Sequence, residues 1–429
     1  SSPLVIPQMW TPELAVQYAL ETNPSVVQAR AELENATGVR MQVRAQLLPH
    51  VNLTGNYNTK ERSLLDVNPL SITADPYTLN NYQVALEFRQ LLFDGFQTFN
   101  AFRERRYSEQ SAYWGWINAT YAITAQVQQS YDAILYRQGV VDAYKESVGT
   151  YAKIADVSKR REAAGDVTPL DGLRAQTELR AAEAQLAAAM SDLAASQETF
   201  RRLLQLPFAE DMFAPIVLQG PLHEKGYSLT LDQSLKKTGD SHPDIVAARL
   251  KTTAAQAGIY SVRGAYAPKV EMFANYSTQN SQFEAASSSL NGWVVGVQGR
   301  WEIFDYYGRE GAIVSKKAAL RSAESELAEK RYQLSSRVRE LFAQKEAMAQ
   351  SITAQRAAVD FGMQSVQEGG KLYMHGGADI EILLDAQSRL SRSQVDLCKG
   401  LFDFNSFVYQ LEYVVGMEPP SSLPTLDLN

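Results

Sequence analysis

The sequence Asn23-Pro24-Ser25-Val26-Val27-Gln28-Ala29-Arg30 returns later in the chain as His242-Pro243-Asp244-Ile245-Val246-Ala247-Ala248-Arg249. The two copies are 219 positions apart (243 minus 24), and the same shift carries Pro49 onto Pro268. Self-similarity at a fixed spacing indicates that the fold is built from repeated structural units. The chain is therefore predicted to be an internal duplication.

Further along the chain the spacing between the copies changes. Phe93-Asp94 returns as Phe304-Asp305, a shift of 211 (304 minus 93). The difference of eight residues (219 minus 211) falls between about residues 58 and 81, which predicts a variable loop there. The predicted organisation is a first repeat over 1–206, a Pro- and Gly-rich linker over 207–230, a second repeat over 231–417 and a C-terminal tail over 418–429.

Two segments of each repeat alternate between apolar and polar residues, as a strand with one apolar face does. The predicted strands cover about 48–57, 82–93, 267–277 and 293–304. Each has about ten residues, the length that crosses a bilayer at a tilt. Polar side chains of these strands are predicted to line a barrel lumen: Glu87, Arg89, Gln298, Arg300 and Glu302.

Four strands leave the sheet incomplete. A soluble sandwich would show the same alternation, with its polar face in water. Four strands cannot close a barrel, however, and an open sheet edge in lipid is very costly. Other chains must therefore complete the barrel, and three copies would give twelve strands. No stretch approaches the eighteen or more apolar residues of a spanning helix, so membrane passage is expected through strands.

Long helices are predicted after the strands, over about 97–158, 169–206, 308–371 and 380–415, and a shorter helix opens each repeat. Apolar residues recur every seven positions along them, with Lys345 as the one departure. Examples are Val127, Ile134, Val141 and Val148, Leu179, Leu186, Leu193 and Phe200, and Leu390, Leu397, Phe404 and Leu411. A sustained seven-residue repeat packs helices side by side as coiled coils. A helix of about 60 residues spans about 90 Å, which predicts an elongated helical wall.

Composition excludes several classes of function. A 45% apolar and 21% charged chain is typical of a folded protein. A net charge of -7 without a long basic run argues against nucleic-acid binding. The single Cys398 excludes an internal disulfide, and the four histidines form no pair at metal-binding spacing. With no phosphate loop or nucleophile elbow, we predict no catalytic residue, no metal site and no cofactor.

Three features together resemble the TolC family of outer-membrane factors over nearly the whole chain. They are the duplicated Asn/His-Pro helix, the strand end Leu91-Leu92-Phe93-Asp94-Gly95, and the segment Tyr373–Gln387 with its His-Gly-Gly turn and Leu-Asp-Ala-Gln helix start. The resemblance implies an α+β membrane protein. Each protomer would give four transmembrane β-strands to a trimeric twelve-stranded barrel, and its antiparallel coiled-coil helices would form a periplasmic tunnel.

The resemblance also implies a function. Such a homotrimer is the outer-membrane exit duct of an efflux or type I secretion system in a Gram-negative bacterium, in contact with outer-membrane lipid. It docks a periplasmic adaptor and an inner-membrane pump, and drugs, metal ions and proteins remain open as substrates, with multidrug efflux the most frequent in the family. The alternative is a soluble periplasmic coiled-coil adaptor or scaffold, which has no need of membrane-length strands. Because the chain begins Ser1-Ser2-Pro3, a secretory signal is expected to be absent or removed, and no lipid anchor is expected.

In the family, tyrosine and aspartate side chains near the helix-to-helix turns narrow the periplasmic entrance. Matching the turns assigns this role to Asp171, Tyr373 and Asp385, with Asp379 and Glu381 as further acidic groups. Simpler roles stay open: Asp171 and Asp379 have the positions of helix-start carboxylates, and Asp385 has that of a solvated helix face.

Glycines occupy both predicted turns. Gly165, Gly376 and Gly377 most simply permit the turn backbone. By resemblance, these exposed turns would also contact the adaptor.

Overall fold

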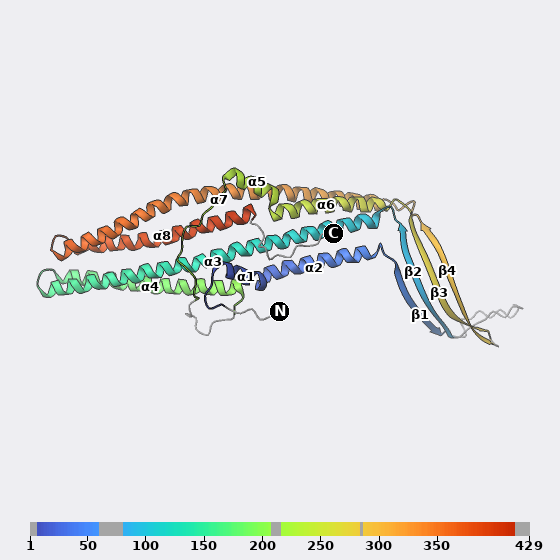
Figure 1. Cartoon of the computed structure of the whole chain (residues 1–429), viewed down its shortest axis with the longest axis horizontal. Coiled ribbons are helices and arrows are strands. Elements are labelled where there is room, and N and C mark those ends of the chain that lie inside the picture. The colour runs from blue at the N-terminus through green and yellow to red at the C-terminus, as the bar shows by residue number, and fades with distance from the viewer. Residues whose placement is uncertain (1–6, 60–79, 207–215, 284–285, 417–429) are drawn as a thin grey trace. The chain divides into compact units, whose positions relative to one another are not determined.

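A computed structural model of the chain describes residues 7–59, 80–206, 216–283 and 286–416. Most of the predicted variable loop, the start of the linker and the C-terminal tail lie outside the described residues. The described elements run in the order α1 Pro12–Thr22, α2 Pro24–Ala45, β1 His50–Thr59, β2 Asn80–Phe93, α3 Gln97–Ala163, α4 Pro169–Leu204, α5 Leu231–Ser241, α6 Pro243–Gly264, β3 Lys269–Phe283, β4 Ala286–Arg300, α7 Gly308–Met374 and α8 Ile380–Val415 (Figure 1).

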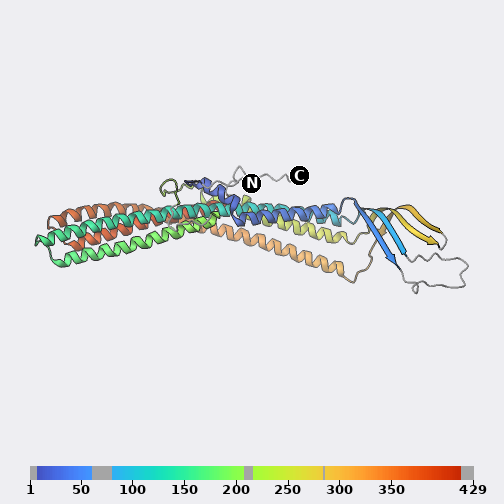
Figure 2. The same ribbon diagram turned by 90° about the horizontal axis from the view of Figure 1, so that it is seen from below.

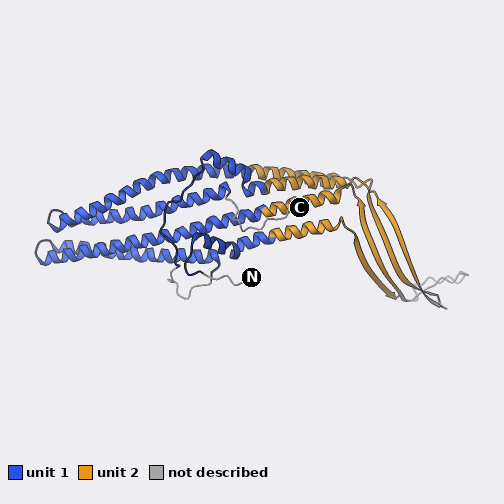
Figure 3. Cartoon of the chain, viewed as in Figure 1, with its two compact units in different colours: residues 1–31, 114–246, 329–429 blue, residues 32–113, 247–328 orange. Residues whose placement is uncertain are grey.

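These elements fall into two compact units (Figure 3). Unit 1 comprises Ser1–Ala31, Trp114–Val246 and Glu329–Asn429, and unit 2 comprises Glu32–Tyr113 and Ala247–Ala328. Each unit takes segments from both predicted repeats. The duplication in the sequence and the compact units of the structure are therefore different divisions of the chain.

Unit 2 contains a four-stranded antiparallel sheet in the order β1-β2-β3-β4 (Figure 1). Directly opposed residues of neighbouring strands share a face of the sheet. The register pairs Leu53 with Leu86, and Tyr276 with Trp293, so apolar side chains gather on one face. Among the described strands, β1 and β4 each have one edge without a partner.

The last strand differs from its predicted bounds. β4 spans Ala286–Arg300, whereas the sequence predicts about 293–304. Arg300 lies opposite Lys269, the first residue of β3, so residues beyond Arg300 have no partner strand. Glu302 consequently lies outside the sheet, and its backbone carbonyl accepts a hydrogen bond from Arg309 Nη1 at 2.8 Å. The prediction that Glu302 belongs to the last strand is therefore wrong.

Unit 1 contains α4, α8 and the parts of α3 and α7 from Trp114 and Glu329 onward. These form two helical hairpins, α3 with α4 and α7 with α8, which lie side by side in both views (Figures 1 and 2). Residues of the seven-residue pattern are buried in unit 1, among them Val127, Ile134, Phe200, Phe404 and Leu411. Burial of each such side chain stabilises the fold by about 1.5–3 kcal/mol. Lys345, the departure from the pattern, lies 4.4 Å from the centre of the Phe342 ring and pairs with Glu346 at 2.8 Å. No described helix has the length and apolar character needed to cross a membrane.

The Asn/His-Pro motif divides each opening helix in two, where one helix was predicted. Proline disfavours the helical conformation of the residue that precedes it, and Asn23 and His242 both have an extended backbone. Asn23 Nδ2 donates to Leu203 O at 2.9 Å, so it satisfies a carbonyl that the end of α4 leaves free. The motif thus fixes the α1–α2 junction to the end of a long helix.

Candidate functional site

The two helix-to-helix turns have the same backbone geometry. Gly165 and Gly376 adopt positive φ values of 82° and 74°, which glycine permits without strain. The next residue in each turn donates its amide to the carbonyl five positions earlier, at 2.9 Å from Asp166 and 2.8 Å from Gly377. This is the Schellman arrangement that ends a helix. Gly377 lies outside the positive-φ region, so the backbone requires glycine only at the other two positions.

Tyr373, predicted to narrow the entrance, lies in the core of unit 1. Its side chain is 2% exposed and packs in a cluster with Tyr151, Ile154 and Ile380. The Arg161 guanidinium lies 4.8 Å from the centre of the Tyr373 ring, and its Nη1 donates to the Tyr373 carbonyl. Tyr373 therefore links the two turns from inside the packed helices.

Two predicted acidic residues are exposed beside the second turn and pair with arginines. Asp385 Oδ2 lies 2.7 Å from Arg389 Nε on the same helix. Glu381 Oε2 lies 3.5 Å from Arg174 Nη1 of α4, so this pair joins the two hairpins. Exposed ion pairs contribute little to stability, and these carboxylates remain accessible to ions.

The other two acidic residues lie at helix starts. Thr168 is the N-cap of α4, and its Oγ1 lies 3.5 Å from Asp171 Oδ1 in the first turn. Asp379 is the N-cap of α8, but its side chain makes no capping hydrogen bond. Both carboxylates are placed to interact favourably with the helix dipole.

The polar face of the sheet brings together three of the predicted lumen residues. Glu87, Arg89 and Gln298 line a groove of about 310 Å³, and Arg89 Nη2 lies 3.6 Å from Glu87 Oε2. Glu271 lies opposite Gln298 on the same face and pairs with Lys269 at 2.7 Å. Sequence reasoning did not assign these two residues to the site, although their alternation placed them on this face.

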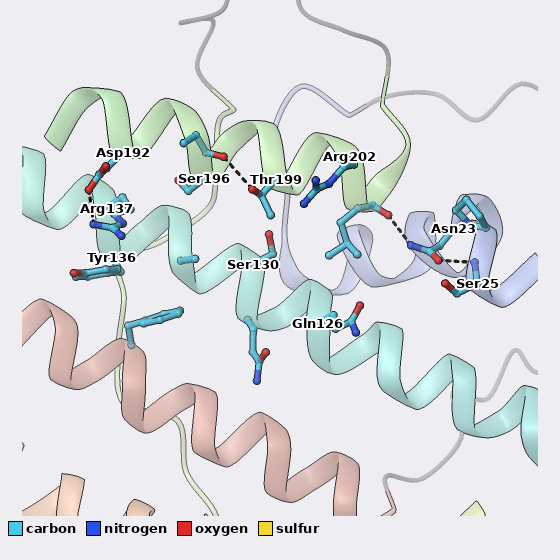
Figure 4. Close-up of a pocket in the computed structure, with 16 residues that line it drawn as sticks. Asn23, Ser25, Gln126, Ser130, Tyr136, Arg137, Asp192, Ser196, Thr199 and Arg202 are labelled. Carbon is cyan, nitrogen blue, oxygen red and sulfur yellow. Dashed lines mark hydrogen bonds and ion pairs between the residues drawn. The ribbon is translucent and has the colours of Figure 1, made fainter. Parts of the chain in front are cut away.

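A larger groove of about 710 Å³ in unit 1 is lined by α3, α4 and the α1–α2 junction (Figure 4). Asn23 lies near one end, where its side-chain oxygen accepts from the Ser25 amide at 2.9 Å. Near Tyr136, Arg137 pairs with Asp192 at 2.8 Å. The charged groups of this pair are therefore matched to each other.

Among the described strands, the sheet has one apolar and one polar face and is open at both edges, and long helical hairpins follow it along the chain. This is the arrangement expected of a membrane channel. The sequence profile of the outer membrane efflux proteins matches residues 15–205 and 235–401. The chain belongs to the outer membrane efflux protein family. It is a channel of the Gram-negative outer membrane and the exit duct of an efflux system, as predicted, rather than a soluble adaptor.

Individual relatives agree with this assignment. The toluene efflux pump outer membrane protein TtgF of Pseudomonas putida is 24% identical over 391 residues, covering 88% of this chain and 77% of the relative. The Campylobacter jejuni CmeC outer membrane channel has a TM-score of 0.83 at 13% identity, over 96% of this chain and 87% of that one. Vibrio cholerae VceC has a TM-score of 0.79 at 18% identity, over 94% of this chain and 96% of VceC. The predicted α+β channel fold is confirmed.

Proposed function

We propose that three copies of this chain form a homotrimer whose sheets close one twelve-stranded barrel. The observation that carries the proposal is the pair of open edges on β1 and β4 within the described sheet. Unpaired backbone groups cost several kcal/mol each in lipid, so the edges must pair with other copies. The apolar face then meets lipid, and the face with Glu87, Arg89, Gln298 and Arg300 lines the lumen.

Native mass spectrometry of the detergent-solubilised protein tests the assembly. We expect one species at three times the chain mass of 47.6 kDa. A monomer that stays in solution without detergent would contradict the proposal.

The exposed acidic residues near the second turn form the proposed periplasmic entrance of the tunnel. Glu381, Asp385 and Asp379 from each copy, together with Asp171, would place a ring of negative charge there. Charged rings favour ions of opposite sign at a pore entrance. Tyr373 does not line the proposed entrance, because its side chain is packed in the core. Its role would be to position the turn through its hydrogen bond with Arg161.

Ion selectivity measured in planar bilayers tests this entrance. We expect the double variant Glu381→Gln and Asp385→Asn to lower the cation-to-anion permeability ratio about twofold or more, because each copy loses two negative charges. Reversal potentials under a salt gradient give the ratio.

Asp240→Asn is the matched control, since Asp240 is exposed on α5, away from both turns. Its selectivity should equal that of the wild type. An unchanged ratio in the double variant would remove both carboxylates from the entrance.

The turns are also the proposed contact with a periplasmic adaptor, which would join the channel to an inner-membrane pump. The apolar side chains of Leu170, Met374 and Ile382 are more than half exposed near the two turns. Exposed apolar groups of this kind are typical of protein-binding surfaces. Gly165, Gly376 and Gly377 leave the turn backbone accessible beside them. The pump supplies the energy, and the channel conducts passively.

A further inference from the structure

Unit 2 contains a groove of about 580 Å³ between the ends of strands β2 and β3 and the helices α3 and α6. It is formed by residues 95–100, after β2, and 260–267, before β3. Because β2 ends at Phe93 and β3 begins at Lys269, the groove lies within a few residues of both strand ends. In an outer-membrane channel this is the depth of the lipid headgroups on the helix side of the membrane.

Exposed aromatic rings line this groove. Phe96, Phe99, Tyr260 and Tyr266 are 64%, 48%, 46% and 40% exposed. Aromatic side chains concentrate at the membrane–water interface, where an apolar ring meets polar headgroups. Their exposure in the chain is consistent with contact to lipid.

The groove is continuous with the apolar face of the sheet. After the bulge in β2, Phe93 lies opposite Val270 of β3. Val270 lies two residues before Met272 on β3, so the two side chains are on the same face of the sheet. Met272 in turn lies opposite Val297, so Phe93 shares the apolar face. The Phe93 and Phe96 rings meet edge to face, with centroids 5.8 Å apart.

One cation in the groove lacks a counter-charge. Arg263 is exposed, its guanidinium lies 5.9 Å from the centre of the Tyr260 ring, and no acidic side chain among the described residues forms an ion pair with it. Two other cations of this unit have acidic partners: Arg309 pairs with Asp305 at 3.0 Å, and Lys316 with Glu104 at 2.7 Å. A guanidinium beside an aromatic ring and without an acidic partner complements a phosphate group.

We propose that this groove binds an anionic glycerophospholipid from the helix-side leaflet. Arg263 contacts the lipid phosphate, and the acyl chains extend from Phe96 and Phe99 toward the apolar face at Phe93. The inference rests on the outer-membrane location of the sheet and is independent of the trimer and of the acidic entrance.

Delipidated full-length protein in detergent, titrated with phosphatidylglycerol and followed by native mass spectrometry, tests the proposal. We expect Arg263→Gln to weaken phosphatidylglycerol binding about fivefold, the effect of one basic residue near an anionic lipid. Phe99→Ala should weaken the binding of phosphatidylglycerol and of phosphatidylcholine alike, because it removes an apolar contact. The matched control is Arg249→Gln, which removes an exposed arginine from the same helix about 21 Å away and should bind like the wild type.

Competition with inorganic phosphate distinguishes a lipid site from a site for a free anion. Inorganic phosphate should not displace phosphatidylglycerol, and displacement at millimolar phosphate would show an anion site instead of a lipid site. Wild-type affinity in Arg263→Gln, or equal losses in Arg263→Gln and Arg249→Gln, would overturn the proposal. Equal melting temperatures of the two arginine variants would show that loss of binding is not loss of fold.

Discussion

Gly95→Ala is expected to destabilise the chain by about 3–5 kcal/mol, through a clash at the junction of strand and helix. Gly95 follows β2 with a φ of 67°. A Cβ at this position would lie 2.3 Å from Gly264 O and 2.5 Å from Ala267 Cβ. The nearest obstacle is a backbone carbonyl at the end of α6, which cannot move without displacing the helix. Urea unfolding in detergent, followed by circular dichroism, measures the loss.

Gly115→Ala provides the matched control. Gly115 lies in α3, and a Cβ there would meet nothing within 4 Å. Alanine in a helix interior is about 0.5–1 kcal/mol more favourable than glycine, so this variant should unfold at slightly higher urea than the wild type. If Gly95→Ala unfolded at the same urea concentration as the wild type, the backbone segments at Gly95 and Gly264 could separate at no cost.

The second repeat shows why sequence could not reveal this constraint. Tyr306 and Tyr307 occupy the places of Gly95 and Phe96 and also have positive φ values, of 51° and 67°. The left-handed backbone alone therefore does not require glycine here. What requires it is the close approach of Gly264, which lies far away in the sequence. Only the packed structure places the two backbones together.

Local patterns were sufficient for most elements of the fold. The two-residue alternation marked the strands, and the seven-residue repeat marked helices whose pattern residues are buried, such as Val127 and Leu411. The end of β4 was missed because a strand ends where its neighbour ends. Arg300 has a partner in Lys269, and the next residues have none.

The candidate entrance was harder to predict, since side-chain direction depends on contacts between distant segments. Tyr373 looked accessible beside a glycine turn, yet Tyr151 and Ile380 enclose it in the core. Glu381 pairs with Arg174 of the other hairpin, a contact that no local spacing indicates. The division into repeats and the roles of the acidic residues stay predictions.

The repeated Asn/His-Pro motif leads to a prediction about acid stability. His242 is fully buried, and its Nδ1 accepts a hydrogen bond from the Asp244 amide at 3.2 Å. Asn23 has the same role in the first repeat, where its Oδ1 accepts from the Ser25 amide at 2.9 Å. The two side chains perform one structural task, but only the histidine can gain a proton.

Burial lowers the pKa of His242 to about 4, although the neighbouring Asp244 carboxylate and the Tyr413 carbonyl act in the opposite direction and Lys330 adds to the lowering. Between the ordinary histidine pKa of about 6.5 and this value, the unfolded chain binds the proton and the folded chain does not. Acidification through this window therefore removes stability, up to about 3 kcal/mol per chain for a shift of this size.

His242→Asn should remove this loss and keep the helix start, because asparagine already does so at position 23. The free energy of unfolding will be measured in urea at pH 7, 6, 5 and 4. We expect its total loss between pH 7 and pH 4 to be about 3 kcal/mol smaller in the variant than in the wild type. Near pH 7 the variant and the wild type should differ by much less.

A second variant distinguishes this residue from general acid sensitivity. Burial raises the pKa of Asp132, which accepts hydrogen bonds from Asn405 and Tyr409, so the folded chain binds the Asp132 proton more readily than the unfolded chain does. The stability that Asp132 contributes is greatest below the ordinary aspartate pKa, and it is lost as the pH rises through the pKa of Asp132 in the folded chain. Asp132→Asn should thus steepen the acid loss, whereas His242→Asn should flatten it. Parallel pH profiles for the two variants would show that neither buried group controls acid stability.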